Sequence, residues 1–167
     1  MPQDESFERR VAEQHRLLDG MFAEVLEAVC AGAEASARAR AAFARLREAL
    51  EVHFDQEERL HYPAVGALSP GRADAVAAIV RAHDGFRAQL AEIHASLASA
   101  RRDEAERRLR ALIEEFVAHE AAEEGLLASL DREIAAGSSA ARSSSARLRA
   151  RFSRSRYDRR HTPSPGR

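Results

Sequence analysis

Four stretches of the chain repeat apolar residues at spacings of three and four positions, and this periodicity constrains the fold more than any other feature. The stretches cover residues 7–29, 43–60, 76–97 and 109–134. This spacing places the apolar side chains on one face of an α-helix, which must then be buried against a partner. Aromatic residues make up only 5% of the chain and alanine is abundant, which also favours helix over strand. The sequence therefore predicts an all-α protein.

Short connections separate the four predicted helices. Pro63 and the turn residues after it divide the chain into two halves. Ser69 is a candidate N-cap, and Pro70 suits the first position of the third helix. Gly137 is a candidate stop for the fourth helix. Four amphipathic helices with short connections favour an up-down-up-down four-helix bundle.

The C-terminal segment differs in composition from the rest of the chain. From Gly137 onward there are nine arginines and one acidic residue, a formal charge of +8, whereas the preceding residues carry −9. A segment with so few apolar groups cannot offset its ordering entropy. We therefore predict a helical domain at residues 1–136 and a disordered, basic, Ser/Arg-rich tail at residues 137–167. Only this tail suits nucleic acid, and we expect a plain solvated tail instead, because a Ser/Arg-rich run is weak evidence of specific binding.

Composition also indicates the compartment. The chain has no apolar stretch long enough to cross a bilayer, so we expect no membrane contact. Its first residues, MPQDESFERR, are polar and do not resemble a signal peptide. Cys30 is the single cysteine, which excludes an intrachain disulfide and suggests a reducing compartment. We expect a cytoplasmic protein, either a monomer or a weak homodimer.

Each apolar stripe contains one histidine at a position that the pattern reserves for an apolar residue. Two of the four histidines are followed four residues later by a glutamate, on the same helix face. An ionised carboxylate buried without a partner is very costly, so this set of groups requires a cation. The predicted metal ligands are His15, His53, Glu57, His83, His119 and Glu123.

The two halves of the chain repeat this arrangement. Each half has a histidine on its first helix and a His-x-x-x-Glu on its second, and VHFDQEERL aligns with AHEAAEEGL. A two-helix unit used twice places its ligands around a pseudo-twofold axis, which suits two metal ions side by side. Two histidines per metal, two bridging glutamates and a bridging oxide or hydroxide would leave one position open on each metal. Such donors suit non-haem iron, although manganese or zinc would also bind.

Four further polar residues flank the predicted ligands. Glu58 and Glu124 fall off the apolar stripe, so we expect them to be solvated. His61 is two helical turns beyond His53, too far to share a metal with it. A supporting role for His61, or use as a substitute ligand, stays open. Tyr62 is expected mainly to pack against the site, with a hydrogen bond as the alternative.

These residues resemble the hemerythrin-like, or HHE cation-binding, domain family over about residues 7–134. HFDQEERLHYP resembles the family's second-helix signature of a histidine, a downstream glutamate pair and a closing aromatic-proline. The resemblance implies a bridged di-iron centre that binds, senses or scavenges oxygen, nitric oxide or peroxide. A redox enzyme, such as an oxidase or peroxidase, and an iron-sulfur repair or iron-handling protein are the alternatives. We expect a binding protein rather than a dedicated enzyme.

The sequence departs from the oxygen-carrying branch of this family at two places. Those carriers have a fifth histidine one turn from the other on the third helix, where this chain has Ile79 and Arg87 around His83. They also have an aspartate at the fifth place after the last histidine, where this chain has Glu123 at the fourth. Four histidines and two glutamates are more similar to the branch associated with iron-sulfur repair and nitric oxide stress. That branch often has an additional cysteine-bearing N-terminal domain.

Overall fold

The structure is a computed structural model of the 167-residue chain. It describes the backbone of residues 7–32 and 36–158, and the side chains of residues 9, 11–32 and 36–136. The α-helices of this part are α1 (Phe7–Cys30), α2 (Ser36–Gln56), α3 (Tyr62–Leu68), α4 (Ala73–Ala98) and α5 (Arg102–Asp158). A π-helical turn, η2 (Glu57–His61), joins α2 to α3, and a 3-10 turn, η3 (Pro70–Arg72), leads into α4.

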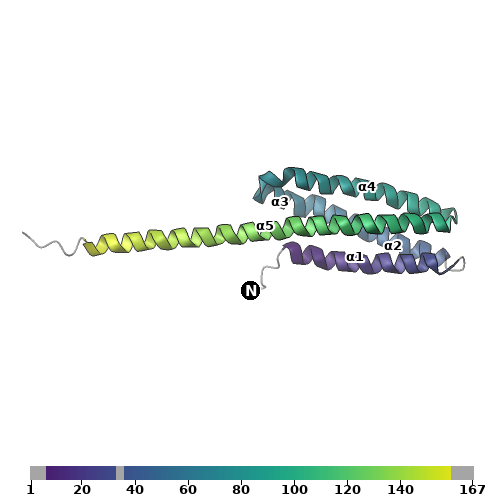
Figure 1. Ribbon diagram of the computed structural model, residues 1–167, viewed down its shortest axis with the longest axis horizontal. Coiled ribbons are helices and arrows are strands. Elements are labelled where there is room, and N and C mark those ends of the chain that lie inside the picture. Colours follow the sequence, from purple (N-terminus) through teal and green to yellow (C-terminus); the bar gives the residue numbers. More distant parts are fainter. Residues whose placement is uncertain (1–6, 33–35, 159–167) are drawn as a thin grey trace, which may run out of the picture. The chain divides into compact units, whose positions relative to one another are not determined.

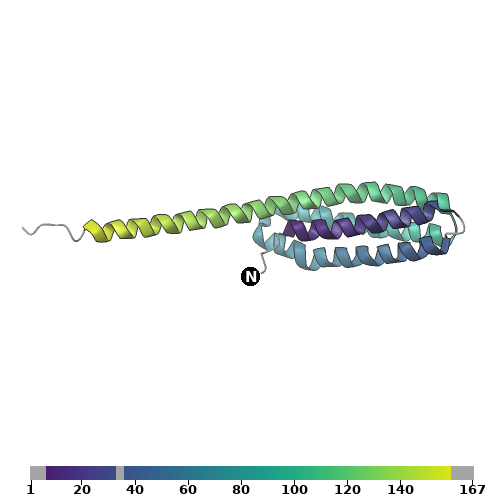
Figure 2. The same ribbon diagram turned by 90° about the horizontal axis from the view of Figure 1, so that it is seen from below.

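The chain divides into two compact units, and the first, which ends at Leu130, is a bundle. In this unit α1, α2, α4 and the first part of α5 lie side by side and alternate in direction (Figures 1 and 2). The predicted all-α, up-down-up-down bundle is therefore confirmed. The four apolar stripes face one another, which removes them from water and supplies the main driving force for the fold.

Two apolar clusters fill the bundle at different heights. The larger cluster includes Leu18 on α1, Leu50 on α2 and Phe116 on α5. The smaller consists of Val11, Val65, Leu127 and Leu130, with Val76 packed against it. On each of α1 and α5, the predicted ligands fall between a residue of one cluster and a residue of the other. The polar site therefore lies between two apolar layers.

The structure differs from the sequence prediction at two places. Pro63 does not break the chain between the two halves, because it occupies the first turn of α3, where its missing N–H costs no helical hydrogen bond. The fourth helix does not end at Gly137 but continues to Asp158. A glycine inside a helix costs only about 1 kcal/mol, and the alanines and arginines that follow favour helix.

The tail therefore differs in part from the prediction. Residues 137–158 continue the helix, where a disordered chain was expected, and residues 159–167 lie outside the described part. The second compact unit begins at Asp131, and the domain boundary expected after residue 136 stays a prediction.

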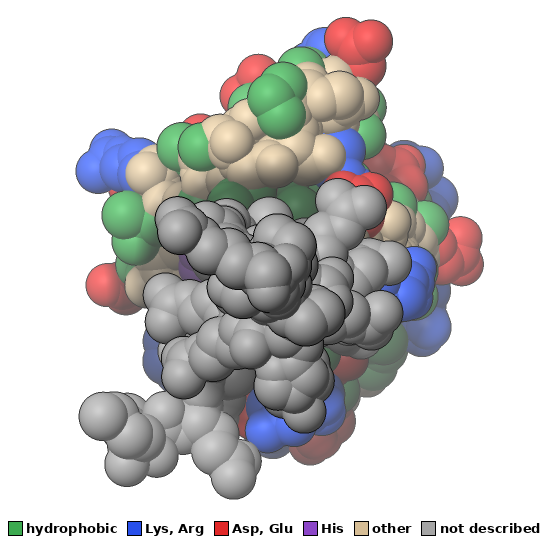
Figure 3. Space-filling view, turned by 90° about the vertical axis from the view of Figure 1, so that its left-hand side faces the viewer, with side chains coloured by type: hydrophobic (Ala, Val, Ile, Leu, Met, Phe, Trp, Pro, Cys, Tyr) green, Lys and Arg blue, Asp and Glu red, His purple; other side chains and the backbone are tan. Residues whose placement is uncertain are grey.

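The surface of the first unit mixes charges of both signs. Arginine and acidic side chains lie near one another on the face seen in Figure 3. Exposed ion pairs join Arg45 to Glu24 and Arg38 to Glu27. Such pairs contribute little individually to stability. Among the described residues, no helix is long and apolar enough to span a bilayer.

Candidate metal centre

All six predicted ligands face the interior between the two apolar clusters. His15 comes from α1, His53 from α2, His83 from α4 and His119 from α5. Glu57 begins the π turn and Glu123 is one helical turn beyond His119. Glu57, Glu123 and His83 are 0% exposed, and the other three histidines are also buried. Four helices thus bring six polar side chains to one dry region.

These six residues form two overlapping sets that could each hold a metal ion. The first set contains His15, His53, Glu57 and Glu123, and the second contains Glu57, His83 and His119. Within each set the ligand atoms all lie within 4.8 Å of one another. The histidines divide two per set, as the sequence analysis expects. Glu57 belongs to both sets, whereas Glu123 belongs only to the first.

The Nε2 atoms of the four histidines point inward. His53 Nε2 lies 3.1 Å from Glu57 Oε1, and His83 Nε2 lies 3.4 Å from Glu57 Oε2. The two oxygens of one carboxylate therefore face histidines of different sets, which is the placement that a bridging ligand needs. His15 Nε2 lies 3.3 Å from Glu123 Oε2, and the Nε2 atoms of His83 and His119 are 3.2 Å apart.

The Nδ1 atoms of three histidines point outward to hydrogen-bond acceptors. His15 Nδ1 donates to Glu124 Oε1 at 2.9 Å, and His83 Nδ1 donates to Glu58 Oε1 at 2.9 Å. A carboxylate can only accept, so it fixes the proton on Nδ1 and leaves Nε2 with a free lone pair. Outer acceptors of this kind orient metal-binding histidines and raise their basicity.

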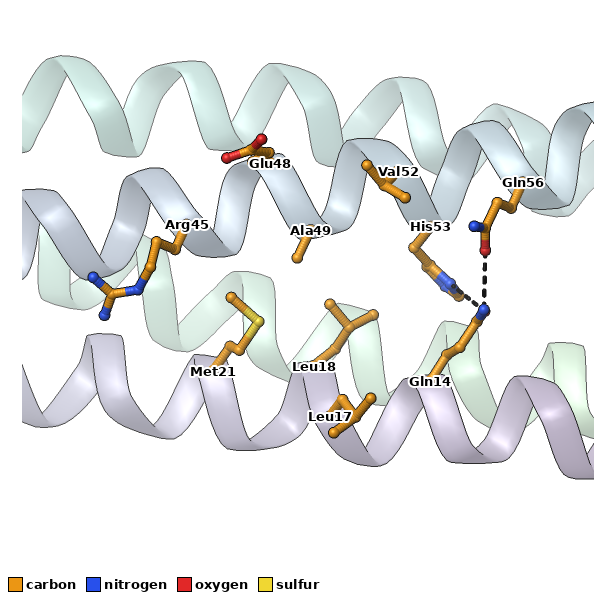
Figure 4. Close-up of a pocket in the computed structure, with 10 residues that line it drawn as sticks. All are labelled: Gln14, Leu17, Leu18, Met21, Arg45, Glu48, Ala49, Val52, His53 and Gln56. Carbon is orange, nitrogen blue, oxygen red and sulfur yellow. Dashed lines mark hydrogen bonds between the residues drawn. The ribbon is translucent and has the colours of Figure 1, made fainter.

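His53 is oriented by an amide instead of a carboxylate. Its Nδ1 donates to Gln14 Oε1 at 3.3 Å, and Gln14 Nε2 donates to Gln56 Oε1 at 2.9 Å (Figure 4). The second bond assigns the amide orientation of Gln14, because its oxygen is then the atom that faces the imidazole. Gln14 was not predicted from the sequence, and only the packing of α1 on α2 brings it to His53.

The expectation that Glu58 and Glu124 are simply solvated is wrong. Both are partly exposed, yet each accepts a hydrogen bond from a buried histidine on another helix. Arg87 also holds Glu58 in place, with Nη1 3.0 Å from Oε1. The sequence feature that could have indicated this role is the pair of consecutive glutamates in each half. The first glutamate of each pair faces the centre, and the second accepts a hydrogen bond from the histidine of a neighbouring helix.

Tyr62 hydrogen-bonds both buried carboxylates rather than only packing. Its hydroxyl lies 2.7 Å from Glu123 Oε1 and 3.1 Å from Glu57 Oε2. The π turn brings it there, since the backbone N–H of Tyr62 bonds the carbonyl of Glu57, five residues earlier. The extra residue turns Tyr62 toward the centre. His61 is half-buried and belongs to neither set of described donors.

Burial strongly perturbs the titration of the inner groups. It lowers the pKa of His53 to about 3 and that of His119 to about 4, so both imidazoles are neutral at pH 7. Burial, together with the nearby charge of Glu123, raises the pKa of Glu57 to about 10. Burial alone would also raise the pKa of Glu123, but contacts with His15 and Tyr62 lower it to about 2. Without a cation, the coupled carboxylates therefore hold one proton between them.

The donor set fits a metal ion. Four buried atoms of the first set have no hydrogen-bond partner, namely His15 Nε2, His53 Nε2, Glu57 Oε1 and Glu123 Oε2. They approach one another at 3.1–3.3 Å without hydrogen-bond geometry. Buried polar atoms normally find partners, so these lone pairs converge on a place suited to a cation. Imidazole nitrogens with carboxylate oxygens suit iron, manganese or zinc.

Comparison with known proteins agrees with this arrangement. A four-helix bundle with converging histidines and glutamates defines a class of helical domains built to hold cations. The model of the hemerythrin HHE cation binding domain matches residues 7–130, and the chain belongs to this family. Neither a comparison with curated proteins nor one with solved structures finds a significant match.

Proposed function

We propose that the protein holds two non-haem iron ions and uses them to bind, sense or scavenge oxygen, nitric oxide or peroxide. Membership of the hemerythrin HHE family supports metal binding. The observation that carries the proposal is the convergence of unpartnered buried lone pairs around a carboxylate shared by two donor sets.

The six inner residues would divide the metal binding between them. His15 and His53 would hold one ion and His83 and His119 the other, through their Nε2 atoms. Glu57 would bridge the two ions, because each of its oxygens faces a different set. Glu123 would complete the first position. The bound ions would supply a coordination position for a small ligand in a site that excludes bulk water.

Anaerobic loading with iron(II) tests the metal assignment. We expect wild-type protein to retain two iron ions per chain after desalting. His119→Ala removes a buried Nε2 donor, so we expect it to retain fewer. The matched control is His94→Ala, since His94 is exposed and stacks on Phe43 outside both donor sets. Wild-type levels of iron in His119→Ala would refute the proposed site.

Addition of nitric oxide or oxygen to the loaded protein tests the ligand class. We expect a stoichiometric change in the absorption spectrum, which is the signature of a small-ligand adduct. Steady consumption of peroxide over many equivalents would instead indicate a redox enzyme. An iron-loaded protein that responds to none of these molecules would exclude the proposed role while leaving the metal assignment intact.

A further inference from the structure

Two surface grooves approach the centre, one from each pair of helices. The groove between α1 and α2 has a volume of about 510 Å³ and reaches His53. The groove between α4 and α5 has a volume of about 480 Å³ and reaches His119. The internal repeat makes these two grooves equivalent positions of the two halves. Their inner ends nevertheless differ.

Side chains close the inner end of the α1–α2 groove. Gln14 spans from His53 to Gln56 by two hydrogen bonds, as Figure 4 shows. Val52 lines the same groove beside them. A molecule in this groove therefore meets an amide that is already hydrogen-bonded on both sides.

Alanines occupy the equivalent places in the α4–α5 groove. Ala82 precedes His83 as Gln14 precedes His15, and Ala122 follows His119 as Gln56 follows His53. Ala118 likewise takes the place of Val52, and all three alanines line the groove. Methyl groups replace the two amides and the isopropyl group, so the sequence repeat leaves this end open.

His119 is the polar group at the inner end of the α4–α5 groove. It is only 7% exposed, and its Nδ1 has no hydrogen-bond partner among the described residues. The other three histidines of the centre each have an outer acceptor. The repeat explains why His119 has no such acceptor. Ala82 takes the position that Gln14 has in the first half, and alanine has no side-chain oxygen to accept a hydrogen bond.

The donor count is also lower on this side of the centre. The set around His15 and His53 has four donors, whereas the set around His83 and His119 has three. Ile79 lies one helical turn before His83 and lines the same groove. An apolar side chain thus stands where α4 could have supplied another donor.

We propose that small uncharged diatomic molecules reach the centre through the α4–α5 groove and bind on its His83–His119 side. This inference rests on the proposed iron site and assigns its open side. The groove favours neutral molecules over anions, because its walls are mainly apolar and Glu115 places a carboxylate on its lining.

The route is tested by filling the α4–α5 groove with the glutamines that the α1–α2 groove has at the equivalent positions. The variant Ala82→Gln with Ala122→Gln should slow nitric oxide association with the iron(II)-loaded protein by about tenfold or more. Iron content should stay at the wild-type level, because the new amide also offers His119 an acceptor. Ala118→Leu, at an exposed position, is a second groove-filling variant that removes no core contact. Stopped-flow absorption gives the rates, and thermal melts check the fold.

The control is Ala49→Leu, which adds the same bulk to the α1–α2 groove and should leave the rate unchanged. Rates that fall equally in both grooves, or only with Ala49→Leu, would overturn the route.

The binding side has its own test in Ile79→His. We expect this variant to keep two iron ions and to lose about tenfold in nitric oxide affinity, because the added imidazole would compete for the open side. Unchanged affinity with full iron would overturn the assignment of the side. Failure of wild-type protein to load iron would overturn the proposed function itself, so the two failures are distinguishable.

Discussion

Single outer hydrogen bonds decide which nitrogen of each buried imidazole faces the centre. Glu124, Gln14 and Glu58 accept from the Nδ1 atoms of three histidines and leave their Nε2 atoms free. These acceptors lie at the rim of the bundle, where Glu58 and Glu124 are only partly buried. Burial lowers the pKa of His53 and of His83, so these two imidazoles are held neutral and in the tautomer that a metal requires. The surrounding glutamates instead raise the pKa of His15.

Loss of one outer carboxylate should weaken metal binding without removing a ligand. Glu58→Ala frees His83 Nδ1, and we expect the affinity for iron(II) or zinc to fall about 10–100-fold. Competition with a chromophoric chelator gives the affinity. Glu51→Ala is the matched control, because Glu51 bonds Arg87 but not His83, and it should change the affinity little. Equal effects of the two substitutions would show that only general surface charge matters.

At the level of secondary structure, the π turn between α2 and α3 selects the side chain that covers the centre. Glu57, Tyr62 and Val65 are all buried along this segment, with spacings of five and three residues. A continuous α-helix would turn His61 inward, one regular turn after Glu57. The π turn places the hydroxyl of Tyr62 between the two carboxylates.

Tyr62→Phe should destabilise the metal-free protein. The substitution leaves two buried carboxyl groups without their shared donor, which costs about 1–3 kcal/mol in the free energy of unfolding. Urea denaturation of the metal-free protein measures this loss. Ser96→Ala removes another buried hydroxyl, whose partner is the backbone oxygen of Glu92, and should cost less because that acceptor is neutral. A larger loss in Ser96→Ala would contradict this account of Tyr62.

For the whole molecule, we expect the centre and the fold to depend on each other. The bundle holds six polar groups between its two apolar clusters, and no cation offsets their burial in the metal-free state. Metal binding to the folded chain alone should therefore stabilise it by mass action. We therefore expect a bound metal to act as part of the core.

Metal addition should raise the melting temperature, and acid should reverse the effect. We expect the gain to grow with the concentration of free iron(II) or zinc and to vanish with a chelator. The metal must displace the proton that the coupled carboxylates hold, because the pKa of Glu57 is raised to about 10, so affinity should fall as the pH is lowered from 7 to 5. Calorimetric scans with and without metal at both values check this. A melting temperature unaffected by metal at pH 7 would exclude the coupling.

The bundle should not need the basic segment that follows it. The family match ends at residue 130, and Leu130 is the last residue of either apolar cluster among the side chains that the structure describes. A chain that ends at Ala136 should keep two iron ions and a melting temperature within a few degrees of the full chain. The full-length chain is the reference, and salt-sensitive binding to DNA is measured on both. Loss of iron from the shorter chain would assign the segment a structural role.

Local sequence patterns predict the helices and the inner face of the candidate site. The periodicity of the four stripes predicts the bundle, and each predicted ligand is a polar residue at an apolar position on one helix. Such features are local, since a residue and its neighbour three or four places away share a helix face whatever the tertiary arrangement. The prediction that the fourth helix ends at Gly137 is wrong, because the helix preference of the residues that follow outweighs the cost of one glycine.

The residues that surround this inner face follow only from the tertiary arrangement of the helices. Glu58 meets His83 and Gln14 meets His53 across helix boundaries, and these contacts depend on the rotation and height of one helix against the next. Tyr62 replaces His61 because of an irregular turn that no periodicity predicts. The open α4–α5 groove likewise follows from two helices packed side by side, where the small side chains of each line the same space.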